Sequence, residues 1–247
     1  MSTTEWVYFL GCRFDTGSIE EAVSSILAET SGGFKYVVTP NVHHMVKIHD
    51  DPVNTQPLYE RAWRVFCDSR VLSRLARFNG LTLPVITGSD LTARLVAVAA
   101  ELRLKIAIIG PTAVACTALI EKYPGLDIVV HTPPMGFIKS ENEIQRCVEF
   151  VVERKAPLTF LAVGMPQQEI LAYHIADHPQ ARGIGLCIGA SIDFLTGKQR
   201  RAPVWVQKAG LEWLHRLLSD PRRLASRYLI ECPRIFRLMY EAQKQLR

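Results

Sequence analysis

Several polar side chains directly follow short apolar runs, at the points where predicted strands end. Asp68 follows the run Val65–Cys67, and a carboxylate in that position can accept a proton from a hydroxyl group. Because ligands of parallel sheets bind beyond the carboxyl ends of the strands, these residues predict one shared pocket. The other polar side chains of this kind are Thr39, Asn41, Gln168 and Asp193.

Each of these residues also has a purely structural alternative. Asp68 can cap a helix that starts at Ser69. Thr39, Asn41 and Asp193 can occupy ordinary turn or cap positions. Gln168 and its neighbour Glu169 can be solvated residues of a first helical turn. Their occurrence at successive strand ends favours the shared pocket.

Positive charge is concentrated at the end of the chain. Residues 198–247 contain twelve Lys and Arg but only four Asp and Glu, whereas residues 1–197 contain 17 basic and 20 acidic side chains. A near-neutral body with a basic end predicts an anionic partner: phosphate, nucleic acid or a membrane surface. Arg223 and Arg227 are four residues apart and share a helix face, which fits a phosphate clamp or a membrane-surface helix.

The elements that must position these residues alternate between strand and helix. This alternation predicts an α/β fold with a mainly parallel sheet covered by helices on both faces. Ser18, with Glu21 three residues later, predicts a capping box at one helix start. We expect strands over 6–10, 34–38, 65–67, 105–109, 127–130, 158–163 and 185–188. We expect helices over 19–29, 42–49, 71–78, 91–102, 113–123, 143–155, 168–176 and 204–218, with further helix after Pro221 and Pro233.

Composition excludes several classes of protein. The chain has 247 residues, of which 48% are hydrophobic and 21% charged, so a disordered or collagen-like chain is ruled out. No apolar run approaches the length of a membrane span, and the polar start predicts no signal peptide. The cysteines are scattered without a C-x-x-C pair, which predicts reduced core residues in a cytosolic protein; they are Cys12, Cys67, Cys116, Cys147, Cys187 and Cys232.

Three other functions are less favoured by the residues. A nicotinamide-dependent oxidoreductase would carry G-x-G-x-x-G after a strand, and this chain does not. A nucleic-acid-binding module would present a more polar basic surface than the apolar end of this chain. The spacing of His43, His44 and His49 places them on different helix faces, which favours ordinary core or surface histidines over a metal site.

A series of short motifs resembles the WecG/TagA/CpsF glycosyltransferase family over roughly residues 5–235. Each motif alone is weak, but eight in the same order are specific. They are Thr39-Pro40-Asn41, Asp68 after a strand, Thr87-Gly88-Ser89-Asp90-Leu91, Pro166-x-Gln168-Glu169, Asp193-Phe194-Leu195-x-Gly197, Arg201-Ala202-Pro203, Gly210-Leu211-Glu212-Trp213 and Pro221-Arg222-Arg223-Leu224-x-x-Arg227-Tyr228.

The resemblance implies a Rossmann-like catalytic domain over residues 1–197 and a basic amphipathic helical appendage over residues 198–247. It implies inverting, metal-independent transfer of a sugar from a UDP-sugar to a polyprenyl-diphosphate-linked saccharide, without a cofactor, for bacterial exopolysaccharide or another cell-surface polysaccharide. An N-acetylmannosaminyl- or N-acetylmannosaminuronyltransferase is the alternative. The enzyme would work as a peripheral protein on the cytoplasmic membrane face and bind no nucleic acid. Both a monomer and a homo-oligomer are compatible with the resemblance.

The same resemblance implies roles for individual residues. Asp68 is the general base. The donor and acceptor pocket is lined by Thr39, Asn41, Gln168 and Asp193, and substrate-binding arginines are Arg201, Arg216, Arg223 and Arg227. Because the chain contains no D-x-D pair for a metal, cationic side chains must neutralise the leaving diphosphate.

One departure from the family pattern concerns positive charge. The family usually has an arginine in a P-E-R-V-T-G motif, whereas this chain has Pro84-Val85-Ile86-Thr87-Gly88. Arginines of the preceding helix are candidates to replace it: Arg70, Arg74 and Arg77.

Overall fold

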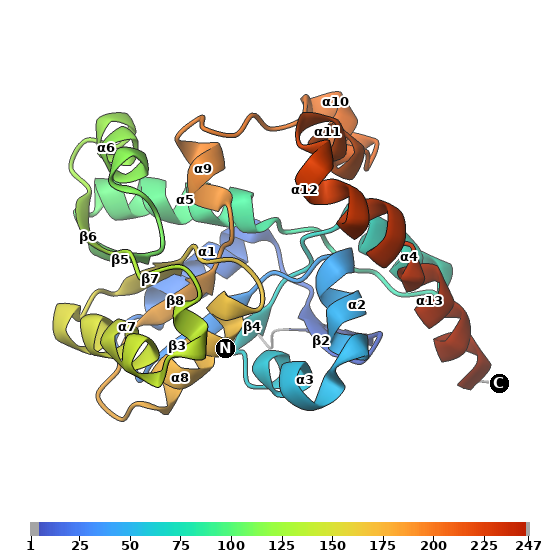
Figure 1. The fold of residues 1–247 in the computed structure, drawn as a ribbon, viewed down its shortest axis with the longest axis horizontal. Helices are drawn as coiled ribbons and strands as arrows, with labels where there is room; N and C mark the ends of the chain where they lie inside the picture. The colour runs from blue at the N-terminus through green and yellow to red at the C-terminus, as the bar shows by residue number, and fades with distance from the viewer. Residues whose placement is uncertain (1–4, 246–247) are drawn as a thin grey trace.

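A six-stranded sheet with the order β4-β3-β8-β7-β5-β6 crosses the molecule, and all of its pairings are parallel. The computed structural model describes residues 5–245 (Figure 1). The predicted α/β fold with a mainly parallel sheet is confirmed. The strands of this sheet are β3 (Lys35–Val38), β4 (Arg64–Val65), β5 (Lys105–Ile109), β6 (Asp127–His131), β7 (Leu158–Leu161) and β8 (Ile184–Cys187).

Helices cover both faces of the sheet, and each face has its own apolar cluster. Buried strand residues alternate between the two clusters; Val38 faces one and Val37 the other. The helices of one face are α1 (Ile19–Ala28), α5 (Gly88–Glu101), α6 (Ala113–Lys122) and α9 (Ser191–Leu195). Those of the other cluster are α2 (Val42–Asp50), α3 (Pro52–Glu60), α4 (Arg70–Phe78), α7 (Glu141–Arg154) and α8 (Gln167–Asp177), with the short helix η1 (Phe137–Lys139).

Local sequence signals set the helix starts. The Glu21 N–H donates to Ser18 Oγ at 3.2 Å, and the Ser18 N–H donates to Glu21 Oε2 at 2.7 Å. The predicted capping box of α1 is therefore confirmed. Asn41, Ser69 and Thr87 cap α2, α4 and α5 in the same way, each by accepting a backbone N–H of the first turn.

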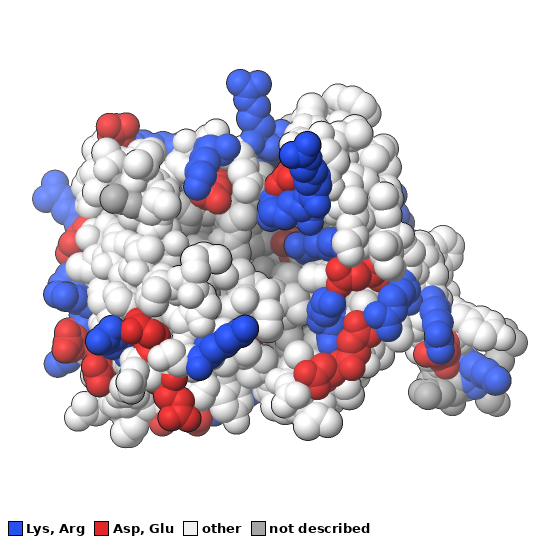
Figure 2. All heavy atoms as spheres, in the orientation of Figure 1, with Lys and Arg blue, Asp and Glu red and all other residues white. Residues whose placement is uncertain are grey.

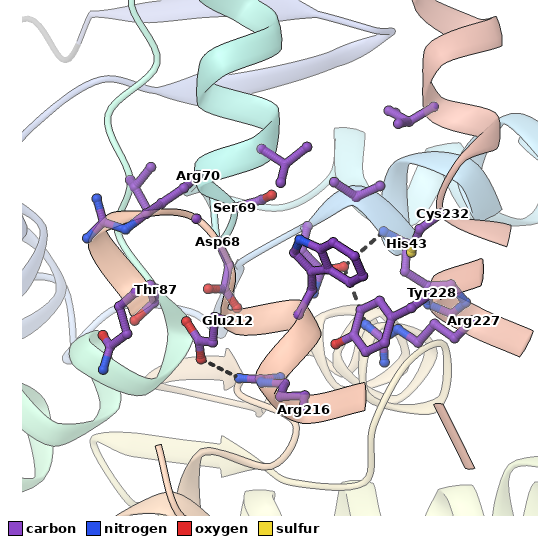
Figure 3. A pocket seen from close by; sticks show the side chains of 18 of the residues that line it. His43, Asp68, Ser69, Arg70, Thr87, Glu212, Arg216, Arg227, Tyr228 and Cys232 are labelled. Carbon is purple, nitrogen blue, oxygen red and sulfur yellow. Dashed lines mark hydrogen bonds and ion pairs between the residues drawn. The ribbon is translucent and has the colours of Figure 1, made fainter. Parts of the chain in front are cut away.

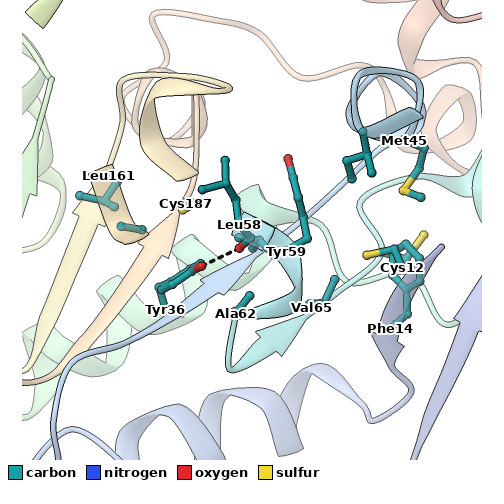
Figure 4. Close-up of a cluster of buried hydrophobic side chains, with 14 of the residues drawn as sticks. Cys12, Phe14, Tyr36, Met45, Leu58, Tyr59, Ala62, Val65, Leu161 and Cys187 are labelled. Atoms are coloured by element: carbon teal, nitrogen blue, oxygen red, sulfur yellow. Dashed lines mark hydrogen bonds between the residues drawn. The ribbon is translucent and has the colours of Figure 1, made fainter. Parts of the chain in front are cut away.

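Tyr36 and Tyr59 lie in the apolar core around β3 (Figure 4). The buried Tyr36 hydroxyl donates to the Leu58 carbonyl oxygen at 2.6 Å, which links β3 to α3. This contact helps to hold the strand that leads to Thr39.

Three parts of the chain differ from the prediction. The first predicted strand lies outside the large sheet, because β1 (Trp6–Phe9) pairs antiparallel with β2 (Cys12–Asp15). Helix α3 was not predicted, and it accommodates Pro57 in its interior. The predicted helix over 204–218 is interrupted at Gly210, whose φ of +74° is the left-handed conformation that ends helices.

The C-terminal segment (198–245) folds back over α2 and α4 (Figure 1). Its residues Ile235 and Met239 are buried in the same apolar cluster as α2, and Arg234 makes two hydrogen bonds to the Asp50 carboxylate. No helix within residues 5–245 is long and apolar enough to cross a membrane. The segment contains α10 (Val204–Lys208), α11 (Glu212–Ser219), α12 (Pro221–Ala225), the π-helical turn η2 (Ser226–Glu231) and α13 (Arg234–Gln245).

The cysteines are free, and all but Cys232 are buried, as predicted for core residues.

Candidate active site

A polar cavity of about 820 Å³ lies where the ends of β3, β7 and β8 meet the C-terminal segment. Figure 2 shows a hollow in this face of the molecule, with Lys and Arg side chains on its rim. The segment contributes most of the positive charge, so an anionic ligand is favoured here. The cationic lining residues are Lys198, Arg200, Arg216, Arg223 and Arg227.

A second cavity, of about 320 Å³, lies between α4 and the C-terminal segment (Figure 3). Apolar and aromatic side chains form much of its wall, whereas Asp68, Thr87 and Asp90 give it a polar end. The apolar part suits a hydrocarbon chain. It is formed by Val42, Val71, Val85, Trp213, Tyr228, Ile235 and Phe236.

The two cavities share a wall. Residues from α2, the end of β4, α11 and η2 contribute to both, so a group at this wall can contact ligands in either cavity. These shared residues are Asn41, His43, Asp68, Arg216, Arg227 and Tyr228.

Asp68 follows β4 and is held by its backbone, since its N–H donates to the Pro40 carbonyl oxygen at 3.0 Å. Ser69, not Asp68, caps α4, so the structural alternative for this carboxylate is wrong. Desolvation raises the pKa of Asp68 to about 7, against the opposing effect of the Arg216 charge. A carboxyl group with such a pKa is well matched to proton transfer near neutral pH.

Arg216 is held by its own helix. Its Nη2 donates to Glu212 Oε1 at 3.0 Å, one helical turn away, and its guanidinium stacks on the Phe194 ring at 4.8 Å from the centroid. Arg216 Nε and Arg227 Nε are buried without a hydrogen-bond partner among the described residues. Buried N–H groups of this kind strongly favour an acceptor such as a phosphate oxygen.

Thr39 and Asn41 lie at the end of β3, as predicted, and line the polar cavity. Helix α5 approaches Thr39 so closely that a Cβ on Gly88 would lie 2.8 Å from Thr39 Oγ1. The Asn41 Oδ1 accepts the His43 N–H at 3.0 Å and lies 2.8 Å from His44 Nδ1. Asn41 is therefore both a helix cap and a cavity residue.

Gln168 also lines the polar cavity, yet it is only 4% exposed. Its Oε1 accepts the Gly189 N–H at 2.8 Å, and its Nε2 donates to Glu169 Oε1 at 2.8 Å. Glu169 is 1% exposed. The alternative that these are solvated first-turn residues is wrong.

The structure separates the remaining predicted residues into two groups. Arg223 lines the polar cavity and Arg227 lines both cavities. Asp193 and Arg201 do not line either one: Asp193 pairs with Lys198 at 3.5 Å, and Arg201 pairs with Asp90. Each of them therefore pairs with a residue of a cavity wall: Lys198 lines the polar cavity and Asp90 the smaller one.

Comparison with known proteins identifies the family of this chain. The family model described as "Glycosyl transferase WecG/TagA/CpsF family" matches residues 7–247. The chain belongs to this family. It is also similar to the N-acetylglucosaminyldiphosphoundecaprenol N-acetyl-beta-D-mannosaminyltransferase of Bacillus spizizenii, with 29% identity over 143 residues. That alignment covers 56% of this chain and about half, 53%, of the relative.

This WecG/TagA/CpsF member lacks the arginine of the family's P-E-R-V-T-G motif, and the structure shows which nearby arginine lies at a cavity. Of the three arginines that are candidates to replace the missing one, Arg70 lines the smaller cavity together with Val85 and Thr87. Arg74 instead donates to the Lys208 carbonyl oxygen in the C-terminal segment.

Sequence reasoning missed several residues of the cavity walls. His43 lines both cavities and lies 3.2 Å from Glu231 of the C-terminal segment, although it was expected to be an ordinary histidine. Glu212 was not predicted as a site residue. The motif Gly210-Leu211-Glu212-Trp213 is the sequence signal that could have identified it. Within residues 5–245 no three His, Cys, Asp or Glu side chains gather in the manner of metal ligands.

Proposed function

We propose that the protein transfers a sugar, with inversion, from a UDP-sugar to a polyprenyl-diphosphate-linked saccharide in the synthesis of a bacterial cell-surface polysaccharide. The observation that carries this proposal is the position of Asp68 on the wall shared by a cationic cavity and a separate, partly apolar cavity. Such a position lets one carboxylate meet two substrates of different chemistry.

In the proposed reaction Asp68 is the general base. The acceptor hydroxyl oxygen forms a bond to the anomeric carbon of the donor, while its proton passes to the Asp68 carboxylate. The bond between that carbon and the diphosphate oxygen breaks, and UDP leaves with the electron pair. A single displacement from the face opposite the leaving group inverts the anomeric carbon and needs no enzyme nucleophile.

The arginines are assigned to the leaving group. Negative charge grows on the diphosphate as the glycosidic bond breaks, and fixed positive charges nearby stabilise that state. Arg216 and Arg227 offer buried N–H groups without a partner among the described residues, and Arg223 lines the same cavity. These three side chains supply the compensating charge in this proposal.

The smaller cavity is assigned to the acceptor lipid. Its polar end contains Asp68, where the sugar hydroxyl would react, and its apolar part leads along Tyr228, Ile235 and Phe236. The first isoprene units next to the diphosphate would pack against those side chains. We further propose that residues 1–197 and 198–247 act as a catalytic domain and an appendage that completes the site.

The Bacillus relative bears on the identity of the sugar. Its name states transfer of N-acetylmannosamine to N-acetylglucosaminyldiphosphoundecaprenol. The same donor and acceptor are therefore candidates here, beside a hexose donor and an N-acetylmannosaminuronic acid donor.

A donor screen tests the proposal. Purified protein is incubated with UDP, a panel of UDP-sugars and NAD, with and without EDTA, and thermal unfolding is followed. Stabilisation by UDP or one UDP-sugar, unchanged by EDTA, is the expected result. Transfer from that donor to polyprenyl-diphosphate-linked N-acetylglucosamine is then measured. Stabilisation by NAD alone would contradict the proposal.

We also propose that the C-terminal segment contacts the cytoplasmic leaflet of the membrane as a peripheral surface. Exposed lysines and arginines such as Lys208, Arg222 and Arg237 lie in the same segment, and such a combination binds anionic lipid surfaces. The apolar side chains that would enter the leaflet are each at least 60% exposed: Val204, Trp205, Leu218, Leu229, Ile230, Phe236 and Tyr240.

Vesicle sedimentation tests the membrane contact. The double variant Leu229→Ser/Ile230→Ser is expected to bind anionic vesicles at least several-fold more weakly than the wild type, because apolar area is lost at the lipid boundary. Met135→Ser, an exposed apolar position outside the segment, is the matched control. Equal binding by all three proteins, or a self-associated state that hides the segment, would contradict the contact.

A further inference from the structure

Glu212 is an acidic residue in a site that must bind a diphosphate. It is the first residue of α11 and lines the smaller cavity together with Asp68. In Figure 3 the Glu212 and Asp68 side chains lie next to each other, with Arg216 beyond Glu212. A carboxylate in this position repels a diphosphate, so Glu212 must serve another purpose than binding it.

The pairing of Arg216 supplies that reason. Its Nη2 lies 3.0 Å from Glu212 Oε1, and the two residues are one helical turn apart. Asp68 makes no ion pair of its own among the described residues. Of the arginines that line the smaller cavity with Asp68, Arg216 is thus the one held by Glu212.

The charges around Asp68 come from several elements. Helix α11 contributes Arg216 and Glu212, and α5 contributes Asp90, which is paired with Arg201. The backbone of Gly88, at the start of α5, also lowers the pKa of Asp68. The remaining charged or titratable side chains of the shared wall are His43, Arg227 and Tyr228, and Arg70 lines the smaller cavity only.

These groups act on the Asp68 carboxylate in opposite directions. Desolvation is the largest influence and raises its pKa, Arg216 lowers it, and Glu212 and Asp90 raise it. If Glu212 were neutral, two changes would follow: its own negative charge would disappear, and Arg216 would be free to pair with Asp68. Both changes favour the ionised form of Asp68 and weaken it as a base.

We propose that Glu212 is a positioning residue for glycosyl transfer: it holds the Arg216 guanidinium for the diphosphate and faces Asp68 with a second negative charge, so that Asp68 keeps enough proton affinity to take the acceptor proton. This role rests on the proposed function of Asp68 as the base. Because Glu212 belongs to the C-terminal segment, the basicity of Asp68 depends on the docking of α11.

The first experiment observes Asp68 directly and needs no substrate. The full chain is labelled with ¹³Cγ-aspartate, the Asp68 carboxyl resonance is assigned by its loss in Asp68→Asn, and its chemical shift is followed against pH. In Glu212→Gln the midpoint is expected to fall by about one pH unit, as for a carboxyl group that gains an unopposed cation. In Arg216→Gln it is expected to rise by a similar amount.

Two controls separate this role from a structural one. Glu212→Asp keeps the charge and is expected to restore most of the wild-type midpoint. Glu231→Gln removes another carboxylate of the C-terminal segment, one that pairs with Lys47 and His43, and it is expected to leave the midpoint in place. An unchanged midpoint in Glu212→Gln would overturn the proposal, whatever the midpoint of Arg216→Gln. If Glu212→Gln does not fold, Glu212→Ala takes its place with the same expected fall.

The second experiment follows kcat/KM against pH with the donor found in the screen. Glu212→Gln is expected to move the acidic limb to lower pH by the same amount and to lower the plateau several-fold, because a weaker base transfers the proton less well. A lower plateau with an unmoved limb would overturn the positioning role. Shifted NMR midpoints without any sugar transfer would instead count against the proposed function and leave the electrostatic role of Glu212 standing.

Discussion

Asp68 and Glu169 are two carboxyl groups whose pKa is raised to about 7 by desolvation, but they face different surroundings. Asp68 opens onto both cavities. Glu169 is 1% exposed, accepts a hydrogen bond from Gln168 and lies 3.8 Å from His44 Nε2. It does not line either cavity. A raised pKa therefore reports burial in both places, and only access to a ligand distinguishes a candidate base from a structural acid.

The largest expected difference between the two groups is in catalysis. Asp68→Asn is expected to keep the fold and slow transfer roughly 10²–10⁴-fold, the usual contribution of a general base. Glu169→Gln preserves shape and hydrogen bonding and is expected to cost less than about tenfold, because Glu169 cannot contact a reacting group. Single-turnover rates measured at saturating donor check both values.

Equal losses in the two variants would remove the distinction. Near-wild-type turnover in a folded Asp68→Asn variant would rule out Asp68 as the base.

The next effect concerns Arg227, a cation that lines the same cavities as Asp68, whereas Glu169 lines neither. Arg227→Gln is expected to weaken UDP binding roughly ten- to a hundredfold, since a charge-assisted hydrogen bond to phosphate is lost. Arg61→Gln is the matched control, because Arg61 pairs with Asp177 instead of lining a cavity. Isothermal titration calorimetry with UDP measures both. Equal affinities for the two variants would exclude Arg227 as a diphosphate ligand.

The pH dependence of transfer sharpens the comparison further. Asp68 must be ionised to accept a proton, so kcat/KM is expected to rise with pH and level off above about 7, falling roughly tenfold per pH unit on the acidic side. Asp68→Asn should lose this limb, and Glu169→Gln should keep it. If the acidic limb of kcat/KM disappeared in Glu169→Gln, the limb would belong to Glu169 and the assignment to Asp68 would be wrong.

The smallest effect is on stability, where the two groups should behave alike. A carboxyl group whose pKa is higher in the folded than in the unfolded protein binds its proton more tightly when folded. Stability from that group is present below the unfolded pKa, near 4, and is lost as pH rises through about 7. Variants that cannot ionise, Asp68→Asn and Glu169→Gln, are therefore expected to gain stability relative to the wild type at pH 8 but not at pH 4.

The gain at pH 8 is expected to be about 1–3 kcal/mol for Glu169→Gln and smaller for the partly solvated Asp68. Urea unfolding at the two pH values measures it. A destabilised Glu169→Gln at pH 8 would show that its hydrogen bonds outweigh the burial of its charge.

Much of the sheet and its ligand-binding edge could be predicted because the signals are local. The strand over 105–109 and the capping box at Ser18 follow from periodicity and side-chain spacing. The same logic placed Thr39, Asp68 and Gln168 at strand ends, and the structure brings these three together at the polar cavity. Parallel strands make this inference possible, since their carboxyl ends share one edge.

The rest of the site depends on long-range contacts that spacing does not encode. His43 meets Glu231 across 188 positions of the chain, and Glu212 reaches the Asp68 region only because the C-terminal segment folds back. Helix α3 was missed because Pro52 and Pro57 oppose a helical prediction, although Pro52 occupies the first turn, where proline is tolerated.

The division of the cavity walls between distant parts of the chain has a consequence for biosynthesis. The ribosome synthesises Asp68 well before Arg216, Arg223 and Arg227, which follow it later in the sequence. A nascent chain that has reached residue 197 thus has the proposed base but not the cations that would receive the diphosphate. The site becomes complete only after these arginines have been synthesised and their segment has folded back onto the sheet domain.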